Sequence, residues 1–126
     1  MPIREDLDLE RDLTVFTVSG ELCYEEIRSL LLTVYARAEY TTRSLFDMRA
    51  ARAGGLASDE IRALVGLIDT HRQARAPSKW AIVAPRDVHF GLSRMFEAYA
   101  ANLTVDVQAF HALEEALAWL EASQLT

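Results

Sequence analysis

The chain has 126 residues, 51% of them hydrophobic and 25% charged, a composition typical of one globular domain rather than of a disordered segment. Thirteen basic and nineteen acidic residues give a net charge of −6, which argues against a nucleic acid as partner. The single cysteine excludes an internal disulfide bond and a zinc site built from cysteines. No apolar run approaches the roughly 20 residues of a transmembrane segment, and the first residues lack the apolar core of a signal peptide, so we expect a cytoplasmic protein.

The hydrophobic pattern of the first half of the chain predicts strands around one helix. β-Branched and aromatic residues favour strands, whereas apolar residues at steps of three and four line one face of a helix. On these grounds we expect, in order, a short edge strand within the first twelve residues, a strand over 13–18 ended by Gly20, a helix over 23–38 and a strand over 44–48. The next residues, which include Arg49, Arg52 and the pair Gly54-Gly55, are expected to form a loop.

The second half of the chain alternates helices and strands. Ser58 is expected to cap a helix that Pro77 stops, with Arg72 and Arg75 near its C-terminal end. The elements that follow are a strand over 80–84, a helix with Leu92, Met95, Phe96 and Tyr99 turned inward, a strand over 104–110 and a last helix marked by Leu113, Ala116, Leu117 and Leu120.

The resulting order, ββαβαβαβα, predicts an α/β fold with a mostly parallel sheet of four or five strands flanked by four helices. Right-handed crossovers would join the parallel strands, and the opening hairpin would supply an antiparallel edge. No repeat and no Pro/Gly-rich linker divides the chain, so we expect residues 1–126 to form a single domain.

Six polar side chains follow two of the predicted strands: Asp47, Arg49, Arg52, Arg86, Asp87 and His89. Because parallel strands end at one edge of a sheet and a helix N-terminus attracts anions, we expect these residues to form a rim that binds a ligand or a partner. Residues 43–94 hold nine basic and five acidic residues, against four and fourteen in the remainder. Solvated helix faces would explain the same excess, so charge alone does not decide.

The sequence holds no motif of a known chemistry. HExxH, GxGxxG, P-loop and GxSxG patterns are all missing, and the three histidines are widely separated. We therefore expect no catalytic residue, no metal site and no cofactor. A base made of His89 with Asp87 is the weakest alternative, because such a pair occurs often by chance.

Four segments together resemble a known family: Leu45-Phe46-Asp47, Ala81-Ile82-Val83-Ala84-Pro85, the stretch 90–96 and the stretch 114–120. In this order and spacing they resemble the STAS and SpoIIAA-like families, especially the small bacterial SpoIIAA-like proteins of unassigned function. The resemblance implies a mostly parallel sheet flanked by helices. It also implies a non-enzymatic regulatory or protein-interaction role.

The resemblance bears on phosphorylation as well. In antagonist STAS proteins, a serine directly after the aspartate at this strand end is phosphorylated, and the added charge disrupts docking. Here Met48 and Arg49 follow Asp47, and the next serine is Ser58. The resemblance therefore implies a module without the serine switch.

A second function remains open, namely a carrier or sensor of a small anionic or lipid-like ligand, because similar folds in lipid-transfer domains admit apolar ligands beneath their helices. The candidate cavity residues are Phe90, Met95, Phe96, Tyr99 and Trp119, although such a stripe is more often plain core. A cavity beneath the third helix would favour a ligand, and a filled core would favour docking to a protein. A homodimer through a sheet edge or a helix face is a further possibility.

Overall fold

A computed structural model describes residues 3–71, 77–103 and 105–122. Its elements are β1 (Ile3–Asp8), β2 (Leu13–Leu22), α1 (Tyr24–Tyr35), β3 (Arg43–Gly54), α2 (Ser58–His71), β4 (Ser78–Val83), α3 (Asp87–Tyr99), β5 (Val105–Phe110) and α4 (Leu113–Ala122). The α/β class and the order ββαβαβαβα are therefore confirmed. Arg72, Arg75 and Thr104, which the sequence assigns to a helix end and a strand start, lie outside the described residues.

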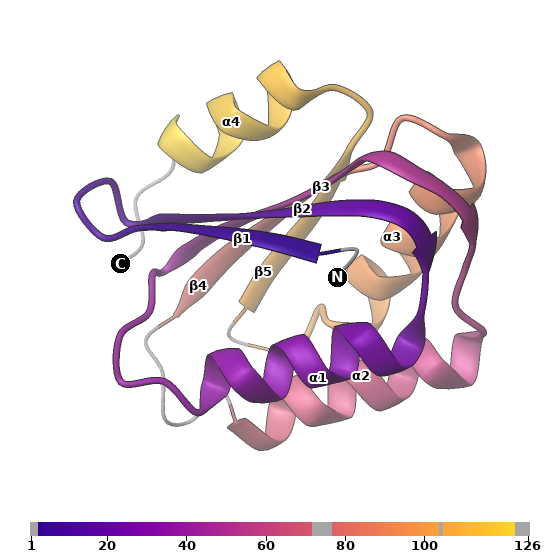
Figure 1. The fold of residues 1–126 in the computed structure, drawn as a ribbon, viewed down its shortest axis with the longest axis horizontal. Coiled ribbons are helices and arrows are strands. Elements are labelled where there is room, and N and C mark those ends of the chain that lie inside the picture. Colours follow the sequence, from indigo (N-terminus) through magenta and orange to yellow (C-terminus); the bar gives the residue numbers. More distant parts are fainter. Residues whose placement is uncertain (1–2, 72–76, 104, 123–126) are drawn as a thin grey trace.

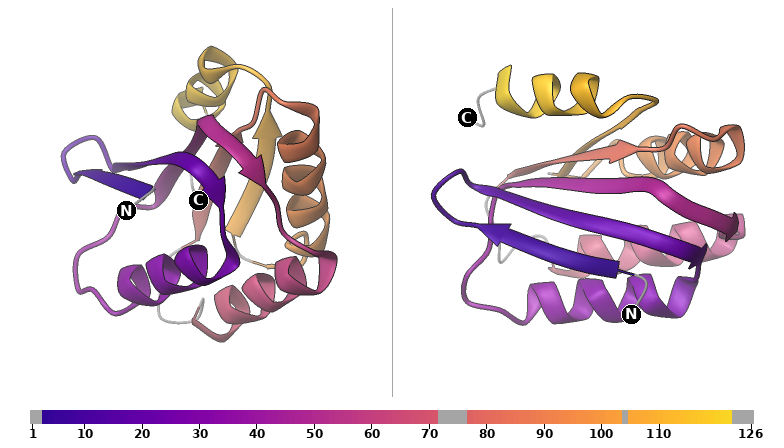
Figure 2. Two further views of the ribbon diagram at one scale, coloured as in Figure 1. Left: turned by 45° about the vertical axis from the view of Figure 1, so that its right-hand side comes forward. Right: turned by 45° about the horizontal axis from the view of Figure 1, so that its top comes forward.

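The five strands lie in the sheet in chain order, β1-β2-β3-β4-β5. β1 pairs with β2 in antiparallel fashion, and the other neighbours are parallel. Because each crossover has the same hand and moves one strand further in the same direction, α1, α2 and α3 fall on one face of the sheet, and α4 covers the other (Figures 1 and 2). Within the described sheet the strand order nowhere reverses. The crevice that such a reversal opens at the strand ends of doubly wound folds is therefore not expected here.

Aromatic side chains hold the face covered by three helices. Phe16 of β2 stacks on Phe46 of β3 with ring centroids 4.8 Å apart, and Phe46 meets Trp80 of β4 at 5.2 Å. Trp80 in turn faces Phe96 of α3 at 6.3 Å. Each such pair contributes about 0.5–1.5 kcal/mol beyond its buried area. The row therefore joins three neighbouring strands to α3.

Among the described helices, only α4 covers the opposite face (Figure 2). Leu45, Ala81 and Val83 of the sheet pack against Ala116 and Leu120 of that helix. The one lysine of the chain, Lys79, lies in this layer with only 3% of its surface exposed. Its Nζ donates to the carbonyl oxygen of Trp119 at 3.1 Å and lies 3.8 Å from the centroid of that ring. Burial lowers the pKa of the Lys79 ammonium group. Trp119 is thus on the far side of the sheet from α3, and the sequence-based choice of Trp119 as a residue of a cavity beneath that helix was wrong.

Two strands extend beyond their predicted ends. The prediction of a loop from Arg49 onward was wrong, because β3 continues to Gly54 and pairs with β2 as far as Leu22. A register shift between Thr17 and Ser19 accommodates an extra residue in this extension. Gly20 does not end β2 but lies within it at φ +75°, a left-handed conformation that glycine adopts without steric cost.

The start of α2 also differs by one residue from the prediction. Ser58 is the first helical residue rather than the cap, and Ala57 precedes the helix. The backbone N–H of Ala57 donates to the carboxylate of Glu60 at 2.9 Å, which is one half of a capping box. No helix among the described residues combines the length and the apolar character needed to cross a membrane.

Candidate functional site

The end of β4 lies beside the middle of β3. Asp47 is paired with Val83, the last residue of β4, so the turn that follows β4 runs past the extension of β3. There the Nη1 atom of Arg86 donates to the carbonyl oxygen of Arg52 at 2.7 Å. The structure thus places Asp47, Arg52 and Arg86 at the same end of the sheet.

Asp47 and Arg49 form a closed ion pair within this rim. The Asp47 side chain is 10% exposed, and it accepts hydrogen bonds from the backbone N–H of Arg49 at 3.1 Å, from Nε at 2.9 Å and from Nη2 at 2.8 Å. Burial by itself raises the pKa of the Asp47 carboxyl, but the hydrogen bonds and charge of Arg49 outweigh burial, and the pKa is lowered. The carboxylate is therefore satisfied by its own strand, whereas Arg49 remains about half exposed, at 53%.

His89 lies inside the molecule rather than on this rim. It belongs to the first turn of α3, next to the exposed residues Arg86 and Asp87, yet only 1% of its surface is exposed. No described residue hydrogen-bonds to either ring nitrogen of His89. All six predicted rim residues thus lie on the strand β3 or at the start of α3, but the side chain of His89 faces the core.

A pocket of about 100 Å³ lies between the sheet and the helices α1, α2 and α3. Its wall is built from hydrophobic side chains, among them Leu64, Trp80 and Phe96, together with two polar residues, His89 and Ser93. Among the described residues that line it, none carries an aspartate, glutamate, lysine or arginine side chain. The arrangement suits an apolar molecule far better than an ion, because a buried charge without a partner is strongly unfavourable.

Of the predicted cavity residues, Phe96 lines this pocket. Phe90 instead stacks on His111 with ring centroids 3.7 Å apart, and Tyr99 lies beneath the guanidinium of Arg62 at 5.1 Å. Met95 is half-buried and is not part of the pocket wall. These three predicted cavity residues therefore lie outside the wall of this pocket.

The reason lies in which face of α3 turns inward. The inward residues follow the helical spacing His89, Ser93, Phe96 and Ala100, with Leu92 beside them at the pocket. The face predicted from apolar residues alone is rotated about the helix axis relative to the buried face, because the buried face includes a histidine and a serine. The sequence signal for the buried face was the spacing of four residues between His89 and Ser93. This signal can be used only if polar residues are allowed on the buried face of a helix.

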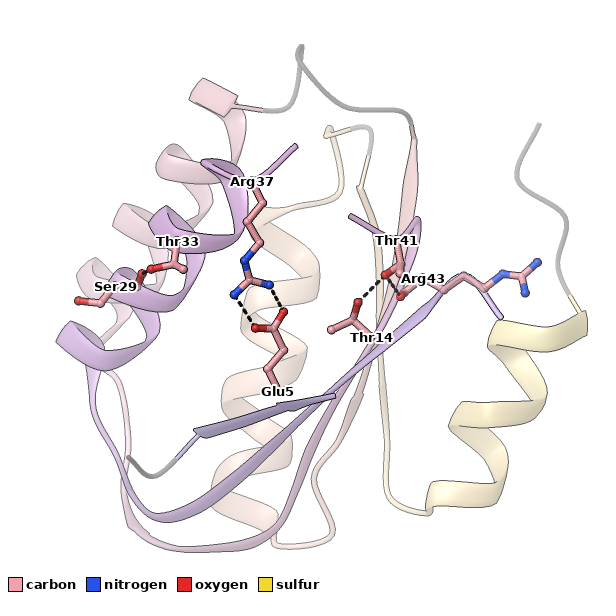
Figure 3. Close-up of polar contacts among 7 residues, drawn as sticks. All are labelled: Glu5, Thr14, Ser29, Thr33, Arg37, Thr41 and Arg43. Carbon is pink, nitrogen blue, oxygen red and sulfur yellow. Dashed lines mark hydrogen bonds and ion pairs between the residues drawn. The ribbon is translucent and has the colours of Figure 1, made fainter. Parts of the chain in front are cut away.

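Polar groups also gather at the other end of the sheet, as Figure 3 shows. Both guanidinium amino groups of Arg37, just after α1, donate to the carboxylate of Glu5 on β1, Nη2 at 2.6 Å from Oε1. The hydroxyls of Thr14 and Thr41 lie 2.7 Å apart, and that of Thr41 donates to the carbonyl oxygen of Arg43 at 2.8 Å. These bonds tie β1 and β2 to the segment after α1, and we assign them a structural role.

The described residues contain no group of three or more histidine, cysteine, aspartate or glutamate side chains that could hold a metal ion. Cys23 is exposed and precedes α1 in an extended conformation, and its side chain makes no capping hydrogen bond. It is therefore not the buried structural cysteine that is the more common case.

Comparison with known proteins bears on the family and the fold. The model of the SpoIIAA-like family matches residues 13–121. A similar solved structure is that of an uncharacterised protein of the DUF3478 family with a SpoIIAA-like fold from Shewanella loihica PV-4, which is 18% identical to this chain. The superposition covers 94% of this chain and 91% of the other, with a TM-score of 0.57, and at this identity it supports the fold alone. No curated protein matches the chain. Since the family match extends from β2 into α4, the chain belongs to the SpoIIAA-like family.

Proposed function

We propose that this chain is a non-catalytic regulatory module whose state is set by a small, largely apolar molecule bound between the sheet and the helices α1, α2 and α3. The observation that carries the proposal is the pocket of about 100 Å³, whose described lining residues include no formally charged side chain. A cavity of about 150 Å³ with similar aliphatic and aromatic walls stays dry and binds benzene in another protein. The volume here suits a molecule of about that class, with small adjustments of the side chains.

The size of the pocket favours a sensor of a small molecule over a carrier of lipids. An acyl chain spans half of a hydrocarbon core about 30 Å thick, and so is about 15 Å long when extended. A chain of that length exceeds the pocket, and its entry would require α3 to separate from the sheet. The absence of charge on the wall likewise disfavours an anion at this position.

The sequence around Asp47 supports an input other than phosphorylation. Met48, where antagonist STAS proteins carry the phosphorylated serine, is buried and lines the pocket. Arg49, one position later, holds the carboxylate of Asp47. Neither residue offers a hydroxyl to a kinase, so a bound ligand is the simpler input for a regulatory role.

A protein partner docking on the rim is the second candidate. The rim presents the half-exposed Arg49, the exposed Arg52 and Arg86, and Asp87 in the first turn of α3. The same turn carries His89 on the pocket side, so one helix start adjoins both places. On this proposal the ligand binds in the pocket, and its binding changes how the rim contacts a protein partner.

Native mass spectrometry after gentle purification tests the ligand function. We expect a bound small molecule on the native chain, and its loss in the variant Leu92→Trp, which places a large ring at the pocket wall. The matched control is Val88→Trp, because Val88 is on the same helix and exposed, and this variant should retain the ligand. Bare protein in every preparation, together with no binding of added benzene-sized molecules, would contradict the function.

The rim is tested by the folded double variant Arg49→Ala, Arg86→Ala. Cross-linking in cells followed by mass spectrometry should show one or more partners whose recovery falls at least about tenfold, as expected for the loss of interface arginines. A variant with two exposed arginines changed elsewhere, Arg28→Ala and Arg62→Ala, serves as the control. Equal recovery from the rim variant and from the native chain would remove the rim from the account.

A further inference from the structure

We infer that His89 is the polar anchor of the pocket, and that the ligand is an uncharged, ring-sized molecule with one hydroxyl group. This inference rests on the proposed ligand function and adds the chemical class of the ligand. It follows from the hydrogen bonding of His89, from the composition of the pocket wall and from the chemistry of the imidazole ring.

The His89 side chain is buried without a hydrogen-bond partner in the part of the chain that the structure describes. The residue is almost wholly buried, and both Nδ1 and Nε2 lack a hydrogen-bond partner among the described residues. An uncharged imidazole carries one donor and one acceptor nitrogen, so neither requirement is met by the protein. Buried polar groups in folded proteins are nearly always paired, and an unpaired one calls for an explanation.

A hydrogen-bond partner can reach the His89 ring from the pocket. His89 forms part of the pocket wall and is enclosed by protein elsewhere. The other polar side chain of the wall, Ser93, donates its hydroxyl proton to the carbonyl oxygen of His89 at 2.8 Å. The proton of Ser93 is thus engaged with the backbone, and a molecule in the pocket is the partner that remains for the ring.

The pocket wall and the His89 ring together restrict the chemistry of the bound molecule. A carboxylate would enter a wall whose described residues include no lysine or arginine, which is unfavourable. A pure hydrocarbon would fill the space but leave the imidazole unpaired. A hydroxyl group both donates and accepts, so it can pair with either ring nitrogen while its carbon frame fills the apolar volume.

Three probes of similar size separate these possibilities: phenol, toluene and benzoate. Their dissociation constants are measured by NMR titration of the native chain, of His89→Leu and of His111→Leu. His111 is exposed, and neither it nor Phe90, on which its ring stacks, lines the pocket, so its variant controls for the loss of a histidine ring outside the pocket. The quantity compared is the ratio of the phenol and toluene constants within each protein, because this ratio changes little when the shape of the pocket changes equally for both.

We expect the preference for phenol over toluene to fall about tenfold in His89→Leu and to stay unchanged in His111→Leu, since a buried hydroxyl without a partner loses about that much affinity. Benzoate should bind the native chain more weakly than phenol. In the native chain the ring nitrogen signals of His89 should shift with phenol and stay in place with toluene, a readout that does not depend on the folding of a variant.

Three results would overturn the inference. An unchanged ratio in His89→Leu, with unmoved His89 ring signals, removes the anchor but leaves the proposed ligand function intact. Benzoate that binds the native chain as tightly as phenol removes the requirement for an uncharged ligand. No binding of any probe contradicts both the inference and the proposed function.

Discussion

The rim and the pocket both include residues from the first turn of α3, but they differ in how their polar side chains are hydrogen-bonded. On the rim, the carboxylate of Asp47 accepts three hydrogen bonds from Arg49, and the guanidinium of Arg86 binds the carbonyl oxygen of Arg52. In the pocket, both nitrogens of His89 lack a partner among the described residues. The charges of Asp47 and Arg49 are therefore paired within the rim, whereas His89 faces the pocket with both ring nitrogens unpaired by any described residue.

The comparison also shows why the two places are built differently. The rim lies on β3 and at the start of α3, where polar side chains reach solvent and one another. The pocket lies where three crossover helices meet one face of the sheet, and helix ridges over a twisted sheet leave a gap that side chains must fill. An unfilled gap beside a polar ring is the arrangement expected of a binding site.

The largest expected effect concerns the aromatic wall of the pocket. Phe96→Ala removes a ring that packs on Trp80 and enlarges the pocket, so we expect a loss of about 3 kcal/mol in the free energy of unfolding. The enlarged pocket should also bind naphthalene better than the native one does. Urea denaturation and NMR titration measure the two effects. An unaltered size preference would show that Phe96 does not bound the ligand volume.

The next effect has the opposite sign. His89→Leu replaces an unpaired buried ring by an apolar side chain, and we expect the unliganded protein to gain about 2 kcal/mol in the free energy of unfolding. His111→Leu removes an exposed ring that stacks on Phe90, so it should lower this free energy by about 1 kcal/mol, a change of the opposite sign. A clear loss of stability in His89→Leu would show that the imidazole already makes a hydrogen bond in the native protein.

On the rim we expect a loss that depends on pH. Because the pKa of Asp47 is lowered in the folded state, its ion pair stabilises the protein above the ordinary carboxyl pKa of about 4, and this contribution is lost as the pH falls through the lowered value. In Arg49→Ala the burial of Asp47 remains without its partner, so its pKa rises. The variant should be about 1 kcal/mol less stable than the native chain at pH 7.

The pH dependence distinguishes the ion pair from simple packing. Once both proteins have a protonated Asp47, near pH 2, the difference between them should nearly vanish, as urea denaturation at the two pH values would show. Arg52→Ala is the control, since Arg52 is exposed on the same strand and contributes its backbone carbonyl to Arg86. An equal loss at both pH values in Arg49→Ala would contradict the role given to the carboxylate.

The smallest effect is expected for Arg86→Ala. The guanidinium of Arg86 makes an exposed hydrogen bond to the backbone carbonyl of Arg52, so the free energy of unfolding should change by about 0.5 kcal/mol or less. Thermal unfolding measures this value. A loss several times larger would mean that Arg86 holds the β3 extension in place rather than presenting a charge to a partner.

Sequence reasoning recovered the element order, because hydrophobic periodicity and turn residues such as Pro77 report local structure directly. It missed the extension of β3, since the stretch after Met48 mixes arginine and alanine without a clear period and is a strand only because β2 continues beside it. Pairing of that kind is a tertiary effect that a local pattern does not contain.

The candidate site was predicted less completely than the fold. Asp47, Arg52 and Arg86 lie at one end of the sheet, since parallel strands share their direction, but their role as a binding rim stays a prediction. The inward face of α3 was misjudged because apolar residues at 92, 95, 96 and 99 form a plausible stripe, whereas the helix turns His89 and Ser93 to the sheet. Which face is buried depends on how α3 packs on β5 and α2, and that is decided by the whole domain.

The most direct measurement is a crystal structure of the chain grown with phenol. We expect electron density for the ring between the sheet and the helices α1, α2 and α3, with the phenol oxygen within about 3.2 Å of a His89 ring nitrogen. A closed, fully packed interior in which a protein group already bonds that nitrogen, or phenol bound only elsewhere, would contradict it.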